Sequence, residues 1–355
     1  MSGKLKSLFL FLFLGLFFFV NSAAASEEGK SEKFDAGKLI VGHIADAHEW
    51  HLWGETKIFL PVIIYSQDKG FSCFSSSRFE EESGIYCGYK LNGYDIVAVN
   101  DDGTVNEKAT AGIWDLSITK NVLSLFIGAA LLLIILISIA RKYTRNTNVP
   151  PKGLQSWLEP IIVFVIDDVI KPGIGEKHYR RFVPFLLTAF FFIWINNMLG
   201  QIPIFPGGAN RTGNTACTIT LALIVFVMQM ANTKKYYWRH IFAMPGVPGW
   251  VLPLITFIEI LGIFLKPFVL MVRLFANMLA GHMVILSFIS LIFIFGELNH
   301  WLGWGVSILS IGFSVFVSML ELLVAFIQAY VFTLLASIYF GMALEEDHHT
   351  KEEHA

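Results

Sequence analysis

The apolar stretch 252–295 contains three ionisable residues in an even spacing: Glu259, Lys266 and Arg273 follow one another at intervals of seven residues. Seven residues of α-helix turn the chain through almost two complete revolutions, so these side chains share one stripe of the helix. Asn277 lies four residues after Arg273 and joins the same face. His282 lies nine residues after Arg273, which predicts a place on the other side of the helix, about 13 Å further along its axis.

The last apolar stretch, 305–341, carries Glu321 and Gln328, again seven residues apart and therefore on one face. Along the axis they are separated by about 10 Å. If the two helices pack antiparallel, Gln328 falls near Arg273 and Asn277, and Glu321 falls near His282. The spacing therefore predicts one deep polar layer and a second layer toward the outer side.

These residue types suit proton transfer beside a fixed positive charge. His282 exchanges protons near neutral pH through its intrinsic acidity, and Glu321 can do so where burial favours its neutral form. Arg273 keeps its charge in a protein, so it is a fixed cation rather than a proton carrier. Its natural partner is a carboxylate, and the sequence places none at its depth. This suggests that another subunit supplies the acid.

Purely structural roles remain open alternatives. A lone arginine can snorkel to the interface, although its mid-helix position argues against this. Asn277 and Gln328 can serve only as hydrogen-bonding contacts between helices. His282 and Glu321 can form a buried structural pair, and Lys266 is expected to extend toward the cytoplasm.

The composition indicates a membrane protein. Of 355 residues, 55% are hydrophobic and 15% are charged, which is more apolar than is usual for soluble domains. The net charge of −2 gives no sign of nucleic-acid binding. We expect an all-α polytopic membrane protein with about five crossing helices, the last two long and tilted. The segments are 121–140, 182–205, 215–231, 252–295 and 305–341, with an amphipathic interfacial helix at 153–170.

Charge placement predicts the orientation. Lys4 and Lys6 precede the short apolar run Leu8–Val20 and the small residues 23–25, so residues 1–25 read as a signal peptide. The basic run "RKYTR" follows the first span and marks the cytoplasmic side. We therefore expect an exported region at 26–115, a membrane domain at 116–345 and a cytoplasmic tail at 346–355.

The exported region is expected to be small and β-rich, with strands at "KLIVGHI", "TKIFLPVIIYS" and "YDIVAVN". A disulfide between Cys73 and Cys87 is one of two open alternatives in an exported segment. His43, His48 and His51 are weak candidates for a metal site. Their spacing matches no established pattern, and packing roles are the favoured interpretation.

Two stretches, "KPFVLMVRLFANMLAGHMVILSF" and "ELLVAFIQAYVFTLLASIYF", resemble the subunit a family of the rotary F-type ATP synthase. The shared pattern is R-L-x-x-N-x-x-A-G-[EH] followed by Q-A-[YF]-[VI]-F, and the resemblance covers about 120–345, including "NNMLGQIP". It implies a non-catalytic proton-channel subunit without a cofactor, in a bacterial inner membrane. The implied partners are the c-subunit ring, the b-subunit peripheral stalk and the rest of the synthase. The exported region lies outside the resemblance.

By this resemblance, Arg273 is the essential arginine that faces the ring carboxylates, with Asn277 and Gln328 close to it. His282 and Glu321 match two positions on the outer proton path. Their order, histidine first and glutamate second, is that of mitochondrial members and the reverse of many bacterial ones.

The resemblance also assigns Glu259 to the cytoplasmic half-channel. Gly200 stands where some bacterial members have an aspartate, which places a second-span proton ligand in doubt. Two offset half-channels would then meet the ring on either side of the arginine. The alternative functions are a stand-alone ion-coupled secondary transporter and, on the weak histidines alone, a membrane enzyme.

Overall fold

The computed structural model describes residues 34–345, apart from 54–55, 68, 82–83, 101, 146–149, 151–152, 203–213 and 243–247. The chain divides into two compact units, Met1–Asp35 and Ala36–Ala355. All the helices and strands below belong to the second unit. The predicted signal peptide, 1–25, and the predicted cytoplasmic tail, 346–355, lie outside the described residues.

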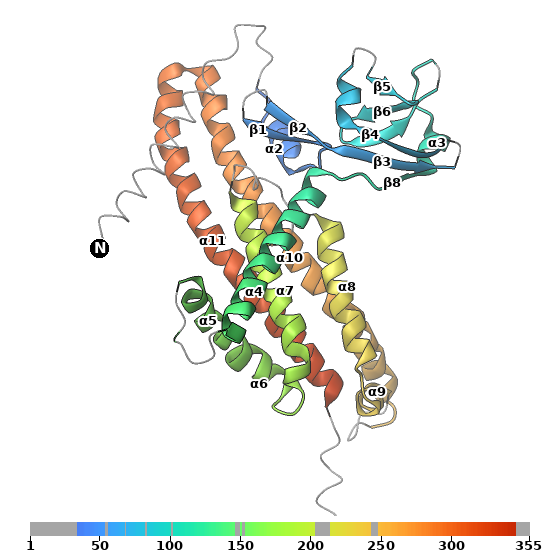
Figure 1. Ribbon diagram of the computed structural model, residues 1–355, viewed down its shortest axis with the longest axis vertical. Helices are drawn as coiled ribbons and strands as arrows, with labels where there is room; N and C mark the ends of the chain where they lie inside the picture. The colour runs from blue at the N-terminus through green and yellow to red at the C-terminus, as the bar shows by residue number, and fades with distance from the viewer. Residues whose placement is uncertain are drawn as a thin grey trace, which may run out of the picture. The chain divides into compact units, whose positions relative to one another are not determined.

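Long apolar helices make up most of the second unit (Figure 1). Four of the described helices are long and apolar enough to cross a membrane; α8 and α9 meet at a bend of 98° and add a fifth crossing if the pair is one span. Each of the five predicted spans overlaps one of the helices α4, α7, α8, α10 and α11. The bounds of the helices are α4 (Lys120–Arg145), α7 (Tyr179–Gln201), α8 (Thr215–Ala231), α9 (Lys235–Phe242), α10 (Leu252–Leu298) and α11 (His300–Leu344).

The two longest helices, α10 and α11, form an antiparallel hairpin with Asn299 between them (Figure 1). The Asn299 side chain accepts a hydrogen bond from the backbone N–H of Trp301 at 3.0 Å, which caps α11. Beyond this turn the helices stay in contact, and the rings of Phe288 and Phe313 stack with centroids 5.3 Å apart. α10 continues through Pro267 as one helix of 47 residues, about 70 Å long, so it extends well beyond the ~30 Å hydrocarbon core or crosses it with a strong tilt.

The predicted amphipathic segment is a helix interrupted by a π-helical turn. It consists of α5 (Leu154–Phe164), η2 (Val165–Ile170) and α6 (Lys171–Ile174). Val165, Val169 and Ile170 are fully buried, whereas Asp167 and Asp168 are exposed. One face of this segment therefore packs into the hydrophobic core between the long helices, and the two aspartates lie on the opposite, exposed face. A Cβ atom on Gly341 of α11 would overlap the carbonyl oxygen of Gly173, so α6 and α11 approach backbone to backbone.

The N-terminal part of this unit carries three small antiparallel sheets. The sheet orders are β1-β2, β4-β3-β8 and β5-β6-β7. The strands are β1 (Glu49–Trp53), β2 (Thr56–Phe59), β3 (Pro61–Ser66), β4 (Gly70–Ser75), β5 (Ile85–Tyr86), β6 (Tyr89–Asn92), β7 (Asp95–Ala98) and β8 (Ile113–Asp115), with short helices η1 (Ser76–Glu80) and α3 (Glu107–Ala111). The stretch predicted as one strand at 56–66 is extended but forms two strands, β2 and β3, which belong to different sheets. The strand predicted at 94–100 is confirmed as β7.

The strand predicted at "KLIVGHI" is wrong, because Ala36–Ile44 forms the helix α2. A short apolar run fits a buried strand and a buried helix equally well by periodicity. Here α2 packs against α10, and this tertiary contact selects the helix. The backbone N–H of Ala45 closes its last turn on the carbonyl of Val41 at 2.9 Å.

Candidate functional site

The deep polar layer predicted from the sequence joins α10 to α11. The side-chain amide of Asn277 donates from Nδ2 to Oε1 of Gln328 at 2.7 Å. Gln328 is buried, whereas Asn277 is exposed on the surface of the helix pair. The antiparallel register proposed from spacing is therefore correct at this layer, and the bond fixes the amide of Asn277 at the edge of an open face.

Arg273 lies one helical turn before Asn277 and is exposed. Large apolar side chains around it, Phe268, Val269 and Val272, are exposed as well. Within the described part of the chain, Arg273 forms no ion pair with a carboxylate. Charged side chains on apolar, membrane-type helices are rare and are usually functional, so Arg273 is a candidate functional residue.

The outer layer places the Glu321 carboxyl group against Gly281. A Cβ atom on Gly281 would overlap Oε1 of Glu321 and would lie 2.8 Å from its Cδ and 3.2 Å from its Cγ. The glycine thus provides the space that the carboxyl group occupies, and Oε1 is buried without a hydrogen-bond donor among the described residues. His282 follows Gly281 directly in α10, so the structure brings Glu321 to the turn that carries His282.

Lys266 lies two helical turns before Arg273 in α10, in the direction away from Gly281 and His282, and it is held between two tyrosine rings. Its Nζ lies 5.9 Å from the ring centroid of Tyr237 on α9 and 5.6 Å from that of Tyr339 on α11. Because α10 is one continuous helix across these positions, Glu259, Lys266 and Arg273 share one stripe, as predicted. Aromatic contacts fix the lysine within it.

Sequence reasoning missed a second group of buried polar residues. Asn196 and Asn197 lie near the end of α7, and both are almost completely buried. The Asn196 amide donates to the carbonyl of Phe192 at 2.7 Å, and its oxygen fills the space left by Gly128 of α4. Further buried polar side chains lie on α4 and α8, namely Asn121, Ser124 and Thr218. The available signal was the recurrence of small and amide residues inside otherwise apolar spans.

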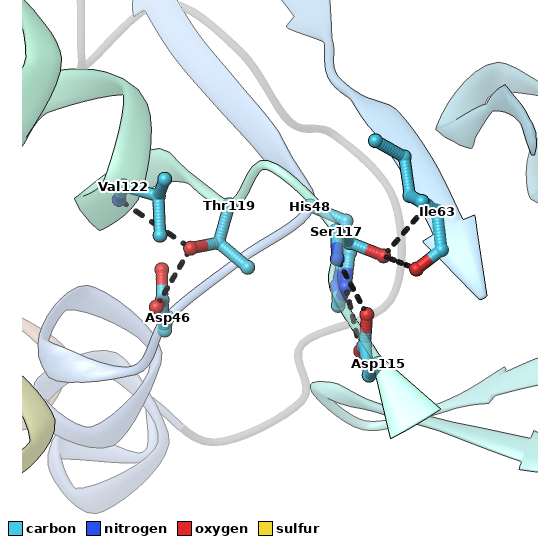
Figure 2. Close-up of polar contacts among 7 residues, drawn as sticks. All are labelled: Asp46, His48, Ile63, Asp115, Ser117, Thr119 and Val122. Atoms are coloured by element: carbon cyan, nitrogen blue, oxygen red, sulfur yellow. Dashed lines mark hydrogen bonds and ion pairs between the residues drawn. The ribbon is translucent and has the colours of Figure 1, made fainter. Parts of the chain in front are cut away.

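Asp46, between α2 and β1, contacts the starts of the two apolar helices α4 and α8. Figure 2 shows its contact with Thr119, just before α4. Its Oδ2 accepts from Thr119 Oγ1 at 2.9 Å and from Asn214 Nδ2 at 3.4 Å, and its Oδ1 accepts from the N–H of Asn121 at 3.1 Å. Asn214 is itself the N-cap of α8 and accepts from the N–H of Ala216 at 2.9 Å. One carboxylate thus satisfies the N-terminus of α4 and contacts the cap of α8.

His48 packs in the same region and contacts a carboxylate rather than a metal-type ligand set. It is buried, and its Nε2 lies 3.6 Å from Oδ2 of Asp115 (Figure 2). Burial opposes ionisation of Asp115, but the contact with His48 and the hydrogen bonds from Ser117 outweigh it and hold the pKa of that carboxyl below its ordinary value. The side chains of His43 and His51 lie outside the described residues. The part of the chain that is described contains no group of three potential metal ligands.

Cys73 and Cys87 are both free and exposed, so the disulfide considered from the sequence is not formed in this structure. Cys73 pairs with Ile63 in the sheet β4-β3-β8, whereas Cys87 lies in the turn between β5 and β6 of another sheet. The two thiols therefore belong to different layers. The third cysteine of the chain, Cys217, is free and lies partly buried in α8.

Comparison with known proteins places these polar layers in a family context. Residues 122–341 match the family model described as ATP synthase A chain. The chain belongs to the ATP synthase A chain family. Every predicted path residue, from Glu259 to Gln328, lies within the matched range. A separate model, described as a domain of unknown function (DUF8433), matches residues 39–116.

Members of the ATP synthase A chain family from several bacteria are similar to this chain. It is 40% identical over 252 residues to an ATP synthase subunit a of Chloroherpeton thalassium, with 70% of this chain and 72% of the relative covered. It is 41% identical over 243 residues to that of Myxococcus xanthus, covering 67% and 76%. It is 32% identical over 340 residues to that of Anaeromyxobacter sp. strain Fw109-5, covering 94% and 76%, so this last similarity extends into the sheet region.

Proposed function

We propose that this chain is the proton-translocating stator subunit a of a bacterial ATP synthase. The observation that carries the proposal is Arg273: a permanent cation exposed on an apolar face, with no carboxylate partner among the described residues. A ring of c subunits, each with a carboxylate at mid-membrane depth, would supply that partner. The chain itself performs no bond chemistry and needs no cofactor in this scheme.

The two layers define the order of events along the path. A proton entering from outside passes Glu321 and His282 and neutralises a ring carboxylate. The neutral carboxyl can then move through lipid, because transfer of an ionised group into hydrocarbon costs far more. When a carboxyl returns to Arg273, the cation favours its ionised form and the proton leaves on the other side.

Glu259, Lys266 and Tyr237 form the polar cluster on the inner side of Arg273, and we assign the exit path to them. Glu259 is the proton acceptor in this group. The Asn277–Gln328 hydrogen bond holds the surface beside the arginine in one geometry, so the amides position the gate rather than carry protons. Arg273 also separates the two half-channels, since an excess proton is repelled by a fixed positive charge.

The proposed orientation places the sheet region in the periplasm and the C-terminus in the cytoplasm, with the chain spanning the inner membrane several times. Basic residues Arg141 and Lys142 at the end of α4 support this orientation through the positive-inside tendency. The amphipathic α5–η2–α6 segment lies at the cytoplasmic interface in this arrangement. The c ring, the b-subunit peripheral stalk and the remaining synthase subunits are the proposed partners.

Replacing Arg273 by alanine tests the proposal directly. In inverted membrane vesicles, Arg273→Ala is expected to abolish ATP-driven proton pumping and proton-driven ATP synthesis, while the assembled complex is still present. Arg141→Ala is the matched control, because it removes an exposed arginine at the end of α4 that lies outside the path. Normal coupled pumping in Arg273→Ala would refute the assignment of the gate.

Purification separates this proposal from a stand-alone ion-coupled transporter. A tagged chain extracted in mild detergent should carry with it a ring of small hydrophobic subunits and a soluble ATPase head. Isolation of an active, substrate-transporting protein without these partners would favour the transporter instead.

A further inference from the structure

One face of the sheet β4-β3-β8 is open, apolar and uncharged. The register pairs Tyr65 of β3 with Phe71 of β4 on one side and with Trp114 of β8 on the other. Phe71 and Trp114 are each 68% exposed, and Tyr65 is 49% exposed. The pairing therefore aligns three exposed aromatic side chains in a row across all three strands.

The open face extends along the sheet by the alternation of a β-strand. Backbone bonds from Leu116 N–H to Ile63 and from Ile118 N–H to Pro61, 2.9 and 3.1 Å long, continue the β8–β3 pairing beyond the named strand. We call the resulting surface the aromatic face. Its members are Pro61, Ile63, Tyr65, Phe71, Cys73, Ser75, Trp114, Leu116 and Ile118, none of them buried and none of them acidic or basic.

The opposite face of the same sheet is the core side. Val62 and Ile64 are fully buried and pack with Tyr89, Ile96 and Ala98 of the β5-β6-β7 sheet. Because side chains alternate along β3, the aromatic face points away from that second sheet. The three exposed aromatic side chains therefore do not belong to the hydrophobic core between the two sheets. A contiguous exposed apolar patch of this kind indicates a contact surface.

The aromatic face is joined to the first membrane span without a linker. Leu116 and Ile118 belong to it, and α4 begins at Lys120. The N–H of Lys120 donates to the carbonyl of Ala47 at 2.9 Å, and the N–H of Asn121 donates to Asp46 at 3.1 Å. Asp46 also accepts a hydrogen bond from the Thr119 hydroxyl group (Figure 2). These bonds hold the end of the sheet at the outer end of α4, which lies at the membrane surface if α4 crosses the bilayer.

We propose that the aromatic face lies in the interfacial region of the outer leaflet and contacts lipid. Tryptophan and tyrosine favour the headgroup level, where their rings are apolar and their polar atoms reach water. A face without charged residues suits contact with the apolar side of the lipid headgroup region. A protein partner is less consistent with this face, because a protein–protein interface normally has a polar rim. The inference depends on α4 being a membrane span and not on the proton path.

Photo-cross-linking to lipid tests the contact. The complete synthase is reconstituted into vesicles of phosphatidylcholine and phosphatidylglycerol in equal parts, together with a phospholipid that carries a diazirine near the headgroup. After illumination, mass spectrometry of this subunit should find lipid on the peptides that contain Tyr65, Phe71 and Trp114. The peptide spanning Tyr89–Ala98, on the other sheet, is the internal control and should remain unmodified.

A pair of substitutions distinguishes lipid contact from unspecific labelling. Phe71→Glu introduces charge at an exposed position of the face and should reduce lipid attachment to background. Tyr94→Glu makes the same change at another exposed aromatic residue, in the turn between β6 and β7 and outside the face, and should leave the labelling unchanged. Because both side chains are exposed, neither change should lower the melting temperature of the complex.

The two exposed thiols, Cys73 and Cys87, give an independent measurement in the same vesicles. Cys73 lies on the aromatic face and Cys87 does not, so a charged maleimide should modify Cys87 much faster than Cys73. Equal rates, together with absent lipid cross-links, would show that the face is open to water. Cross-links from the face to another subunit or to a second copy would show that protein covers it. Either result overturns the proposal.

Discussion

Gly281 provides a direct test of how Glu321 is positioned. A methyl group in Gly281→Ala would overlap the Glu321 carboxyl group and lie 2.8 Å from its Cδ, compared with about 3.5–4 Å for a relaxed contact. Overpacking of this kind costs about 1–3 kcal/mol, and alanine recovers at most about 1 kcal/mol of helix propensity. The carboxyl group is the group that can move, so the substitution should displace it from its site.

The expected effect is a loss of proton flux by about tenfold, which corresponds to about 1.4 kcal/mol. It is measured as ATP-driven acidification of inverted vesicles and as proton-driven ATP synthesis, each normalised to the amount of assembled complex. Gly262→Ala is the matched control, since it lies in the same helix and its Cβ would meet no atom within 4 Å. That variant should pump normally.

A compensating change separates displacement of the carboxyl group from general misfolding. Glu321→Asp, combined with Gly281→Ala, shortens the side chain by one methylene and should recover part of the lost flux. If Gly281→Ala pumps as well as Gly262→Ala, the close contact does not position Glu321. If the double variant is worse than Gly281→Ala alone, the steric explanation is wrong.

Three further outcomes are expected. Exchanging the two outer residues, His282→Glu with Glu321→His, should restore more ATP-driven pumping than either single change, because the pair retains one carboxyl group and one imidazole. Asp46→Ala should destabilise the sheet region by about 1–2 kcal/mol through loss of the α4 cap, seen as faster proteolysis of that region in outward-facing vesicles. Asp115→Asn should lower the thermal stability of the same region at neutral pH. The pKa of Asp115 is depressed in the folded chain, so its carboxylate stabilises the fold fully above about pH 4, the ordinary pKa of an aspartate. This stabilisation is lost as the pH falls through the depressed pKa. The melting temperatures of mutant and parent should therefore converge in acid.

The helices and the register of the deep layer could be predicted from the sequence because both follow from helical geometry. Seven-residue spacing fixed the face of Arg273, and the antiparallel arrangement of two neighbouring helices then brought Gln328 to Asn277. Long apolar segments are strong signals, since the bilayer leaves little choice of structure. These relations need no knowledge of individual side-chain contacts.

Contacts between segments distant in the chain could not be predicted in this way. Gly281 in the sequence is only a weak helix former, and its function as space for Glu321 depends on the local distance between α10 and α11. The segment 36–44 became a helix because α10 packs on it. Strand β8 has only three residues, too few for a period-two signal, so the aromatic row across Tyr65 and Trp114 was not visible.

The direct connection of β8 to α4 also sets an order for biogenesis. β3 is the central strand of its sheet and needs β8 as its second neighbour. The last backbone bond of that pairing is made by Ile118, two residues before α4 begins. In the proposed orientation, the sheet can close only after the chain has been exported as far as this residue, which is also when α4 reaches the membrane. Closure of this sheet and insertion of α4 would then be coupled during synthesis.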